Sequence, residues 1–534
     1  METTINSLFL RSVLILVLTV VTAFPSGAYD FMENGLAYNI NEDGISVQVT
    51  YQRSTSSGYS NLTGDLVIPS SVYHNGIKYP VTSIGDLAFF RCSGLTSVVI
   101  PNSVTKICFK AFMECTGLTS VDIPGSVTEI GNSAFYGCLN LSSLHVPGSV
   151  ESIGALAFMS CCGLSLITVD ESNAFYDSRD NCNAIVETAT NTLVLGSNST
   201  IIPNSIESIG MYAFVNCNGL ESVVIPNSVT EIGKSAFHAC SGLTSLTIGN
   251  SVTTIGETAI SYCYGLETVF IPKSVVSIGN GAFSYCSGLS TLIVEGENPY
   301  YDSRDDCNAI IETENNKLIA GCKNTVIPNT ITSIDDFAFY GCNDLKSLTI
   351  PNSVLSIGKN AFYGCRNMTS VTIPNSVVSI GVSAFSSCDG LKSLIIGSSV
   401  TSIGTGAFTC GSALSSITCK IKEPQNITYG DSYHIFKNAS SLNGVDTETC
   451  ILKVPMGSLE TYRSRMPWSE FANIVVEGDV NNDEAVTAAD VTEIYNILLD
   501  SSREVPSSYD VDGDGEVTSA DITAIYNVIL GEQK

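Results

Sequence analysis

Residues 101–124 read PNSVTKICFKAFMECTGLTSVDIP, and residues 124–147 read PGSVTEIGNSAFYGCLNLSSLHVP. Both stretches run from a proline through Ser-Val to an isoleucine, an Ala-Phe pair, a cysteine and a leucine, and both end in an apolar residue and a proline. The pattern returns every 23 residues, and a dozen such units lie between Ile84 and Phe408. A fixed period of this length indicates a solenoid, in which each unit forms one rung and buries its apolar face against its neighbours.

The segment 95–100, LTSVVI, shows how one rung is built. Its apolar residues at the first, fourth and sixth positions match the strand pattern of a leucine-rich repeat. Alternation along a strand directs Val98 and Ile100 into the core and Val99 outward. Pro101 has no N–H to give to a sheet, so it is expected to end the strand.

Eleven of the 19 cysteines form a ladder in register with the repeat. They are 23 residues apart except across two gaps of 56 residues, and they are Cys92, Cys115, Cys138, Cys161, Cys217, Cys240, Cys263, Cys286, Cys342, Cys365 and Cys388. The ladder has neither histidine partners nor the close cysteine pairs of a zinc site, so it predicts a row of small, buried, reduced side chains. Cys419 and Cys450 lie beyond the last rung and are candidates for a disulfide bond.

The two gaps share an insertion of 33 residues. Residues 175–185, FYDSRDNCNAI, return 125 residues later as residues 300–310, YYDSRDDCNAI. An apolar strand follows each copy, so we expect enlarged rungs that carry a β-hairpin at about residues 170–201 and 295–326. Asp177, Arg179 and Asp180 have the chemistry of a catalytic or metal site, but their duplication with the repeat favours a structural turn held by local side-chain bonds.

One residue of each predicted strand points outward, and together these residues form a strand face. The face consists of Val99, Asp122, His145, Thr168, Val224, Thr247, Phe270, Ile293, Thr349, Thr372, Ile395 and Thr418. A ligand surface is one interpretation, since solenoids bind along extended faces. The β-propensity of a repeated strand explains the same composition, and both interpretations stay open. The candidate ligand-binding residues are Asp122, His145, Thr247, Phe270 and Thr349, and His145 is expected to be a surface side chain and not a catalyst.

The rung consensus Ile-Pro-x-Ser-Val-x-x-Ile-Gly-x-x-Ala-Phe-x-x-Cys-x-x-Leu resembles the BspA-like leucine-rich repeats of bacterial surface proteins, over roughly residues 82–420. Residues 29–81 resemble the strand-rich N-terminal cap of such proteins, and residues 421–477 resemble the cap that closes the solenoid. The resemblance implies adhesion and protein binding.

The acidic segment 478–534 contains a duplication at a spacing of 31 residues. Oxygen-bearing side chains occupy positions 1, 3, 5, 9 and 12 of each copy, and position 7 would offer its carbonyl oxygen. The first loop is Asp479, Asn481, Asp483, Ala485, Thr487 and Asp490, and the second is Asp510, Asp512, Asp514, Glu516, Thr518 and Asp521. The sequence therefore predicts two Ca²⁺ sites. The second loop has Gly515 at the sharp turn of position 6, whereas Glu484 there is expected to weaken the first site.

An amphipathic helix is expected after each loop, with Val491, Ile494, Tyr495 and Leu498 in the first copy and Ile522, Ile525, Tyr526 and Ile529 in the second as its apolar residues. Such a loop–helix duplicate resembles a type I dockerin, which implies Ca²⁺-dependent folding and docking to a cohesin-type protein. The expected fold is therefore a mainly β or α/β leucine-rich repeat solenoid of 23-residue rungs, followed by a small all-α calcium-binding dockerin-like domain.

Charge and the first residues restrict the setting. The chain has 24 Lys and Arg against 52 Asp and Glu, a net charge of −28, so it would repel nucleic acid and acidic membrane surfaces. Residues 13–24 form an apolar run that is short for a transmembrane helix and suits a signal peptide over residues 1–28. We expect an exported protein that is extracellular or associated with the cell surface, without membrane insertion.

These features favour a secreted or cell-surface protein that is not an enzyme. In this hypothesis the solenoid binds a protein or a glycan, and the calcium-dependent tail docks to a cohesin-type partner. The alternative is a structural or targeting subunit of an extracellular polysaccharide-degrading assembly. The sequence has no nucleophile elbow, no His-Glu-x-x-His zinc motif and no phosphate-binding loop.

Overall fold

The computed structural model describes residues 29–51, 62–429, 434–437, 444–481, 483–499, 509, 511 and 517–530. The chain divides into two compact units, Met1–Asp177 and Ser178–Lys534, and each is described by itself. The predicted signal peptide, residues 1–28, lies outside the described residues.

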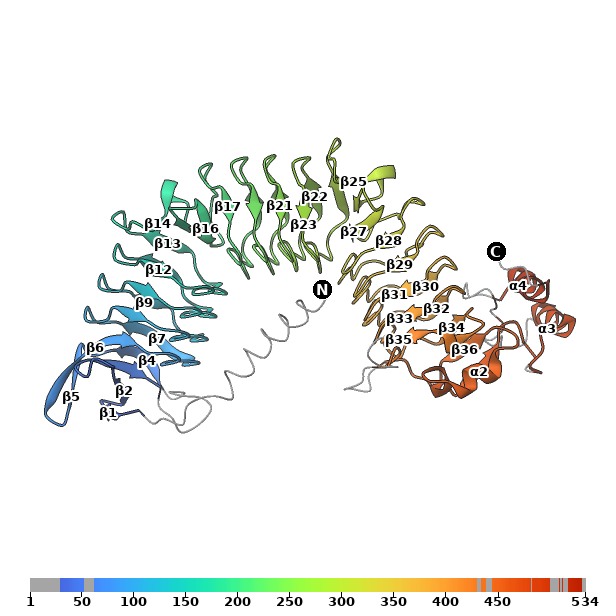
Figure 1. The fold of residues 1–534 in the computed structure, drawn as a ribbon, viewed down its shortest axis with the longest axis horizontal. Helices are drawn as coiled ribbons and strands as arrows, with labels where there is room; N and C mark the ends of the chain where they lie inside the picture. The colour runs from blue at the N-terminus through green and yellow to red at the C-terminus, as the bar shows by residue number, and fades with distance from the viewer. Residues whose placement is uncertain are drawn as a thin grey trace. The chain divides into compact units, whose positions relative to one another are not determined.

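The first unit begins with an antiparallel arrangement that leads into the repeats (Figure 1). Its strands are β1 (Phe31–Glu33), β2 (Leu36–Ile40), β3 (Val47–Thr50), β5 (Ser71–His74) and β6 (Ile77–Ile84). β1, β2 and β3 pair in antiparallel order, whereas β3 pairs with β6 in parallel. The change to parallel pairing at β6 gives the following rungs an edge on which to stack.

Each rung of the first unit contributes to two rows of parallel strands. The short row is β8 (Lys106–Ile107), β10 (Glu129–Ile130) and β12 (Ser152–Ile153). The second row is β4 (Thr63–Val67), β7 (Gly94–Val99), β9 (Ser120–Asp122), β11 (Ser143–Val146) and β13 (Leu166–Val169), and the unit ends with β14 (Tyr176–Asp177). The short row, formed by the Ile-Gly column, is a second set of strands that the sequence analysis did not anticipate.

The second unit also has a short row and a row of longer strands. Its short row comprises β17 (Ser208–Ile209), β19 (Glu231–Ile232), β21 (Thr254–Ile255), β23 (Ser277–Ile278), β28 (Ser333–Ile334), β29 (Ser356–Ile357), β31 (Ser379–Ile380), β33 (Ser402–Ile403) and β35 (Thr428–Tyr429). The longer strands are β18 (Ser222–Val224), β20 (Ser245–Thr247), β22 (Thr268–Ile271), β24 (Thr291–Val294), β30 (Ser370–Ile373), β32 (Ser393–Ile396) and β34 (Ser416–Cys419). The described rungs contain no α-helix, so the solenoid is a β structure, with tight turns where the Ala-Phe pairs lie.

Most rungs stack through one phenylalanine and one cysteine, and Ile260 takes the place of the phenylalanine in one rung. Phe89, Phe112 and Phe135 lie in parallel with ring centroids 5.1 and 5.2 Å apart, and Phe339, Phe362, Phe385 and Phe408 do the same in the second unit. The cysteine ladder is buried throughout. The Cys115 thiol, for example, donates to the Phe89 carbonyl of the preceding rung at 3.0 Å. The thiols thus fill space and satisfy backbone oxygens.

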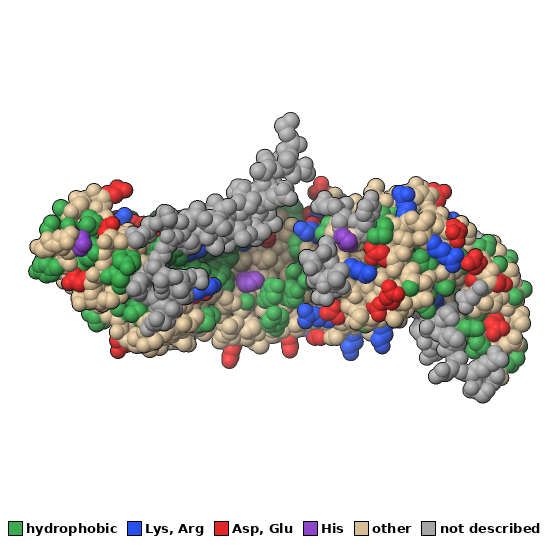
Figure 2. Space-filling model, turned by 90° about the horizontal axis from the view of Figure 1, so that it is seen from below, with side chains coloured by type: hydrophobic (Ala, Val, Ile, Leu, Met, Phe, Trp, Pro, Cys, Tyr) green, Lys and Arg blue, Asp and Glu red, His purple; other side chains and the backbone are tan. Residues whose placement is uncertain are grey.

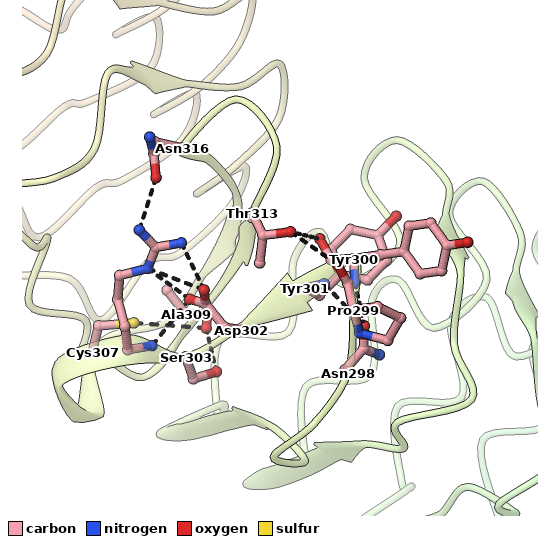
Figure 3. A network of polar contacts seen from close by, with 11 residues as sticks. Asn298, Pro299, Tyr300, Tyr301, Asp302, Ser303, Cys307, Ala309, Thr313 and Asn316 are labelled. Atoms are coloured by element: carbon pink, nitrogen blue, oxygen red, sulfur yellow. Dashed lines mark hydrogen bonds and ion pairs between the residues drawn. The ribbon is translucent and has the colours of Figure 1, made fainter.

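The enlarged rungs carry hairpins, β15 (Ile185–Glu187) with β16 (Thr192–Leu195) and β26 (Ala309–Glu312) with β27 (Lys317–Gly321). A short 3₁₀ turn, η1 (Arg179–Asn181) or η2 (Arg304–Asp306), precedes each hairpin. The strand β25 (Tyr301–Asp302) lies directly before η2. The Arg304 guanidinium pairs with Asp302 at 2.6 Å and donates to Asn316 at 2.7 Å (Figure 3). These contacts hold the turn against the hairpin, which favours the structural interpretation of this repeated motif.

Beyond the last rung the chain closes the solenoid and continues into two helices. The closing segment contains η3 (Pro424–Asn426), β36 (Ile451–Val454), α2 (Leu459–Ser464), η4 (Trp468–Glu470) and β37 (Asn473–Val476). Trp468 is fully buried there, and its indole N–H donates to the Tyr429 hydroxyl at 2.8 Å. The final helices are α3 (Ala488–Leu499) and α4 (Ser519–Leu530), which pack against each other.

Two expectations at this end of the solenoid differ from the structure. Thr418, expected on the outward strand face, is buried at 6 % exposure because β34 pairs with β36, which sets the buried Lys453 directly beside it. All the cysteines lie in the described part of the chain, and no disulfide bond joins any of them. The Cys419 thiol instead accepts a hydrogen bond from the Tyr462 hydroxyl at 3.1 Å.

Candidate functional site

The first predicted calcium loop, residues 479–490, is held in shape by its own oxygens. Asp479, at position 1, accepts backbone N–H bonds from Asp483 at 3.1 Å and from Glu484 at 2.7 Å. The side chains of Asn481 and Asp483 each accept an N–H from two residues further along, at 3.0 and 2.9 Å. These hydrogen bonds form Asx turns, which set the path of the loop from position 1 to position 7.

Glu484 occupies position 6 with a left-handed φ of 65°. This is the conformation that glycine adopts without strain and that a glutamate adopts at a cost. The Glu484 carboxylate lies 3.2 Å from the guanidinium of Arg463 on α2, although both side chains are largely exposed. The loop therefore makes its sharp turn in spite of the departure from glycine.

Asp490, at position 12, is fully buried where α3 begins. Its Oδ1 accepts N–H bonds from Val480 at 2.8 Å and Asn481 at 3.2 Å, and its Oδ2 accepts from Thr487 at 2.8 Å. A carboxylate in the first turn also suits the positive end of the helix dipole. Asp490 thus ties both ends of the loop to the helix.

The second copy repeats this closure. Asp521 is fully buried and accepts N–H bonds from Val511 at 2.6 Å and Thr518 at 2.7 Å. Both residue pairs are 31 positions from their counterparts in the first copy. The predicted ligands that lie outside the described residues are Asp510, Asp512, Asp514 and Glu516.

The donor set of the first loop suits a hard divalent cation. Every predicted ligand offers oxygen, which Ca²⁺ prefers. Burial raises the pKa of the Asp479 carboxyl, and the nearby carboxylates of Asp490 and Asp483 raise it further, against backbone hydrogen bonds that lower it. A cation would relieve this repulsion. Within the described ranges, however, no three His, Cys, Asp or Glu side chains converge into a metal-holding cluster.

The two helices present apolar side chains at equivalent positions. Ile494 and Ile525 are fully buried between them. Four others of the predicted apolar residues, Tyr495, Leu498, Tyr526 and Ile529, are between 39 and 57 % exposed. Leu499 and Leu530, at 72 and 68 %, extend the exposed set. A small two-helix module has too little interior for both apolar stripes, so part of each faces outward.

The candidate residues of the strand face lie on separate rungs. In the first unit Asp122 and His145 are exposed, and His145 Nδ1 lies 3.0 Å from the Thr168 hydroxyl. In the second unit Phe270 is 60 % exposed, Thr247 borders a hollow of about 430 Å³ and Thr349 borders another of about 390 Å³. The structure therefore places these residues on separate rungs and not in one site. Figure 2 shows one side of the molecule, and uncharged side chains cover much of it.

Sequence reasoning missed an aromatic row on the turns that follow the Ala-Phe pairs. It consists of His238, Tyr262, Tyr285, Tyr340 and Tyr363. The available signal was the recurrence of tyrosine in this part of the rung. The residues occupy two columns, however: one directly follows the phenylalanine, and the other directly precedes the cysteine. Only the stacking of rungs brings the columns together.

Within the described part of the chain, no helix has the length and apolar composition needed to cross a bilayer. Among curated proteins, none matches this chain. The chain is similar in structure to a leucine-rich cell surface protein from Faecalibacterium prausnitzii, with 24 % identity, coverage of 86 % of this chain and 97 % of that one, and a TM-score of 0.43. It is also similar to a leucine-rich repeat protein from Bacteroides ovatus, with 24 % identity, coverage of 75 % of this chain and 99 % of that one, and a TM-score of 0.38. For the pneumococcal vaccine antigen PcpA the identity is 19 %, the coverage is 84 % of this chain and 100 % of that one, and the TM-score is 0.40.

Two family models match the chain. The model of the Dockerin type I domain matches residues 477–530, which include both loops and both helices. The model of the BspA type leucine rich repeat region matches residues 71–185, 195–303 and 316–448, in six copies. These ranges cover most of the chain and coincide with its stacked rungs. The chain therefore belongs to the BspA-type leucine-rich repeat family and carries a type I dockerin domain at its C-terminal end.

Proposed function

We propose that this protein is an exported, non-enzymatic binding protein whose C-terminal module docks in a Ca²⁺-dependent manner to a cohesin-type partner. Its two domain types are typically non-catalytic, and both are typical of extracellular or cell-surface proteins. The observation that carries the proposal is the duplicated closure of the two loops by Asp490 and Asp521.

In this proposal the first loop holds one Ca²⁺ and the second loop a second ion. Asp479, Asn481, Asp483, Thr487 and Asp490 would offer side-chain oxygens and Ala485 its carbonyl. The bound ion supplies positive charge that offsets the carboxylate repulsion and links the loop to α3. Asp490 keeps the start of α3 against the loop through its three N–H bonds, so loop order and helix position are coupled.

The docking surface that we propose is the exposed apolar set on α3 and α4. Tyr495 and Tyr526 stand at equivalent positions, 57 and 49 % exposed. Exposed aromatic and aliphatic residues grouped on a small module are typical of protein–protein contact. The cation would act at a distance from this surface, by fixing the helices that present it.

Calcium binding is tested on the full chain by titration calorimetry. Asp490→Asn and Asp521→Asn should each remove one site. Asp446→Asn is the control, since Asp446 is a half-buried aspartate of the closing segment with local hydrogen bonds of its own. A chain that takes up no Ca²⁺, or whose uptake is unchanged in both loop variants, would contradict the proposal.

Docking is tested by capture of the full chain on immobilised cohesin domains, with Ca²⁺ and with chelator. We expect retention only with Ca²⁺, and its loss in the double variant Tyr495→Ala/Tyr526→Ala. Met456→Ala is the control, because Met456 is 58 % exposed but belongs to the closing segment. Retention that persists in chelator, or in the double variant, would refute calcium-dependent docking through these helices.

For the solenoid we propose binding of a protein or glycan along its surface, with the strand face as one candidate. Asp122, His145, Thr247, Phe270 and Thr349 remain proposed contacts. The exposed Phe270 ring is the strongest of them, since a partner would bury most of its area. The alternative role, a targeting subunit of a polysaccharide-degrading assembly, requires the same docking step and a cohesin partner that also recruits hydrolases.

A further inference from the structure

The aromatic row runs along the side of the second unit at the tight turns. Its rings touch in sequence, with centroid distances of 5.0 Å for His238–Tyr262, 4.3 Å for Tyr262–Tyr285, 5.0 Å for Tyr285–Tyr340 and 4.9 Å for Tyr340–Tyr363. All of these side chains are half-buried. Each ring therefore packs by one part against its rung and leaves another part accessible, as amphipathic aromatic residues do.

The row is continuous across the second insertion. The Tyr262 N–H donates to the Ser284 carbonyl at 2.8 Å, and the Tyr285 N–H donates to the Tyr340 carbonyl at 2.7 Å. The Gly341 N–H then donates to the Tyr363 carbonyl at 2.7 Å. The rungs on either side of the insertion thus stack directly at this turn, although the hairpin of β26 and β27 separates them in sequence.

A glycine makes room for the central ring. A Cβ on Gly341 would lie 2.3 Å from the Tyr285 ring, so only glycine allows the ring to lie across that rung. Tyr262 and Tyr285 themselves adopt left-handed φ angles of 59° and 58°. Gly341 and Gly364 occupy the same column in the next rungs. The same column is left-handed in other rungs, for example at Arg91 and Glu114, so this conformation belongs to the repeat.

A polar cleft opens beside the row. The hairpin of β26 and β27 lies between β23 and β28 and keeps these strands from pairing, which leaves a cavity of about 100 Å³. Phe337 and Tyr340 line it on one side and Ser284 on the other. Ser284 is 6 % exposed, and its hydroxyl has no hydrogen-bond partner among the described residues. Such a hydroxyl is able to form a hydrogen bond with a polar group that enters the cleft.

The cleft is acidic. Glu312, Asp335 and Asp336 line it, and its lysine, Lys317, is already shared between Glu312 at 3.5 Å and Asp335 at 3.1 Å. Together with a net charge of −28, this arrangement disfavours anionic ligands. Carboxylates and a hydroxyl beside flat aromatic rings suit a ligand with hydroxyl donors on its edges and C–H groups on its faces.

We infer that the aromatic row and the adjoining cleft form a binding platform for a neutral polysaccharide. Because Tyr262 and Tyr285 stack on each other face to face, the sugar rings would lie against the parts of the tyrosine rings that remain accessible, and a sugar hydroxyl would enter the cleft toward Ser284. A row one ring wide along successive rungs suits a linear chain better than the broad patch of a protein interface. The inference rests on the proposed function only in treating the solenoid as a ligand-binding part, and it is independent of docking.

The test is affinity gel electrophoresis of the full chain, in Ca²⁺ and in chelator, with soluble β-glucan, xylan and mannan as neutral probes and polygalacturonate as an anionic one. We expect at least one neutral probe to retard the chain in both conditions. Tyr340→Ala and Tyr363→Ala should each weaken retardation by about tenfold, the loss of one well-stacked ring. Tyr340→Phe should keep it, because the ring remains.

Tyr73→Ala is the matched control, since it removes an exposed aromatic ring from β5 of the first unit, which belongs to no binding surface proposed above. It should leave retardation unchanged, and unchanged circular dichroism spectra should show that every variant is folded. Ultraviolet difference spectra provide a second readout, since ligand stacking perturbs tyrosine absorption in the unmodified chain. Retardation by no neutral probe, retardation by polygalacturonate alone, or loss in Tyr73→Ala with none in Tyr340→Ala and Tyr363→Ala would overturn the inference. Failed cohesin capture with intact retardation would contradict docking alone.

Discussion

Replacing Phe362 with alanine tests whether the stacked phenylalanines hold the solenoid together. Phe362 is 1 % exposed, and its ring centroid lies 5.0 Å from that of Phe339 and 5.0 Å from that of Phe385. Its N–H donates to the Ala384 carbonyl at 2.8 Å, and its carbonyl accepts the Cys388 thiol at 3.2 Å. Alanine keeps both backbone bonds, so the variant isolates the contribution of the ring.

The expected cost follows from that environment. Truncation of a buried phenylalanine costs about 3–5 kcal/mol, and neighbours fixed in a repeat cannot easily collapse into the cavity. We expect the upper half of this range, because two ring–ring contacts are lost together. The assay is urea unfolding followed by the fluorescence of Trp468, the single tryptophan of the chain, which belongs to the same buried cluster as Phe362.

Phe270→Ala is the matched control for stability. The Phe270 ring is 60 % exposed, so its loss should change the free energy of unfolding by less than about 0.5 kcal/mol. A loss below about 1 kcal/mol for Phe362→Ala, or a loss equal to that of the control, would refute the view that ring stacking between rungs supplies the stability.

Three further predictions concern the loop, the thiols and the surface. Glu484→Gly should strengthen Ca²⁺ binding by the first loop, because φ is 65° there, whereas Glu484→Gln should not; equal calorimetric affinities would contradict this. Burial raises the pKa of Cys388 from its ordinary value of 9.0 to about 12, so the folded thiol keeps its proton where the unfolded one loses it. The contribution of this thiol to the free energy of unfolding is complete below pH 9 and falls as the pH rises toward 12, by up to about 1.4 kcal/mol per pH unit. In urea unfolding, the free energy of unfolding of Cys388→Ala should therefore decline less steeply at alkaline pH than that of the unmodified chain. Arg463→Ala should change the thermal midpoint little, since its ion pairs with Glu460 and Glu484 are exposed and such pairs contribute about 0–1 kcal/mol; a large drop would show that they fix the loop to α2.

The repeat alone predicted most of the solenoid, because a side chain in a periodic structure meets its own counterpart in the next rung. Val98 and Ile100 are buried and Val99 is 46 % exposed, as alternation along the strand requires. The buried cysteine ladder follows in the same way, since the column has no partner for any other chemistry. The loop positions of Asp479 and Asp490 were likewise visible, since ligand spacing is local in sequence.

Predictions that depended on the ends of the structure were less successful. Thr418 is buried because the closing strand β36 pairs with its rung. The repeat pattern does not predict that further strands stack beyond the last rung. Tyr495 and Tyr526 have the spacing of buried helix residues but lie at the surface. Helical periodicity identifies an apolar stripe, and only the amount of available partner surface decides how much of that stripe is covered.

The sequence by itself determined the rung, its core and the duplication of the C-terminal loops, all of which are set by spacing along the chain. The tertiary structure alone decided which side chains of different columns meet. Tyr285 precedes its cysteine and Tyr340 follows its phenylalanine, yet the rungs stack so that the rings lie 5.0 Å apart across the hairpin. The physical reason is that backbone hydrogen bonds between the turns join the two rungs, while the hairpin of the insertion lies beside them and lines the cleft.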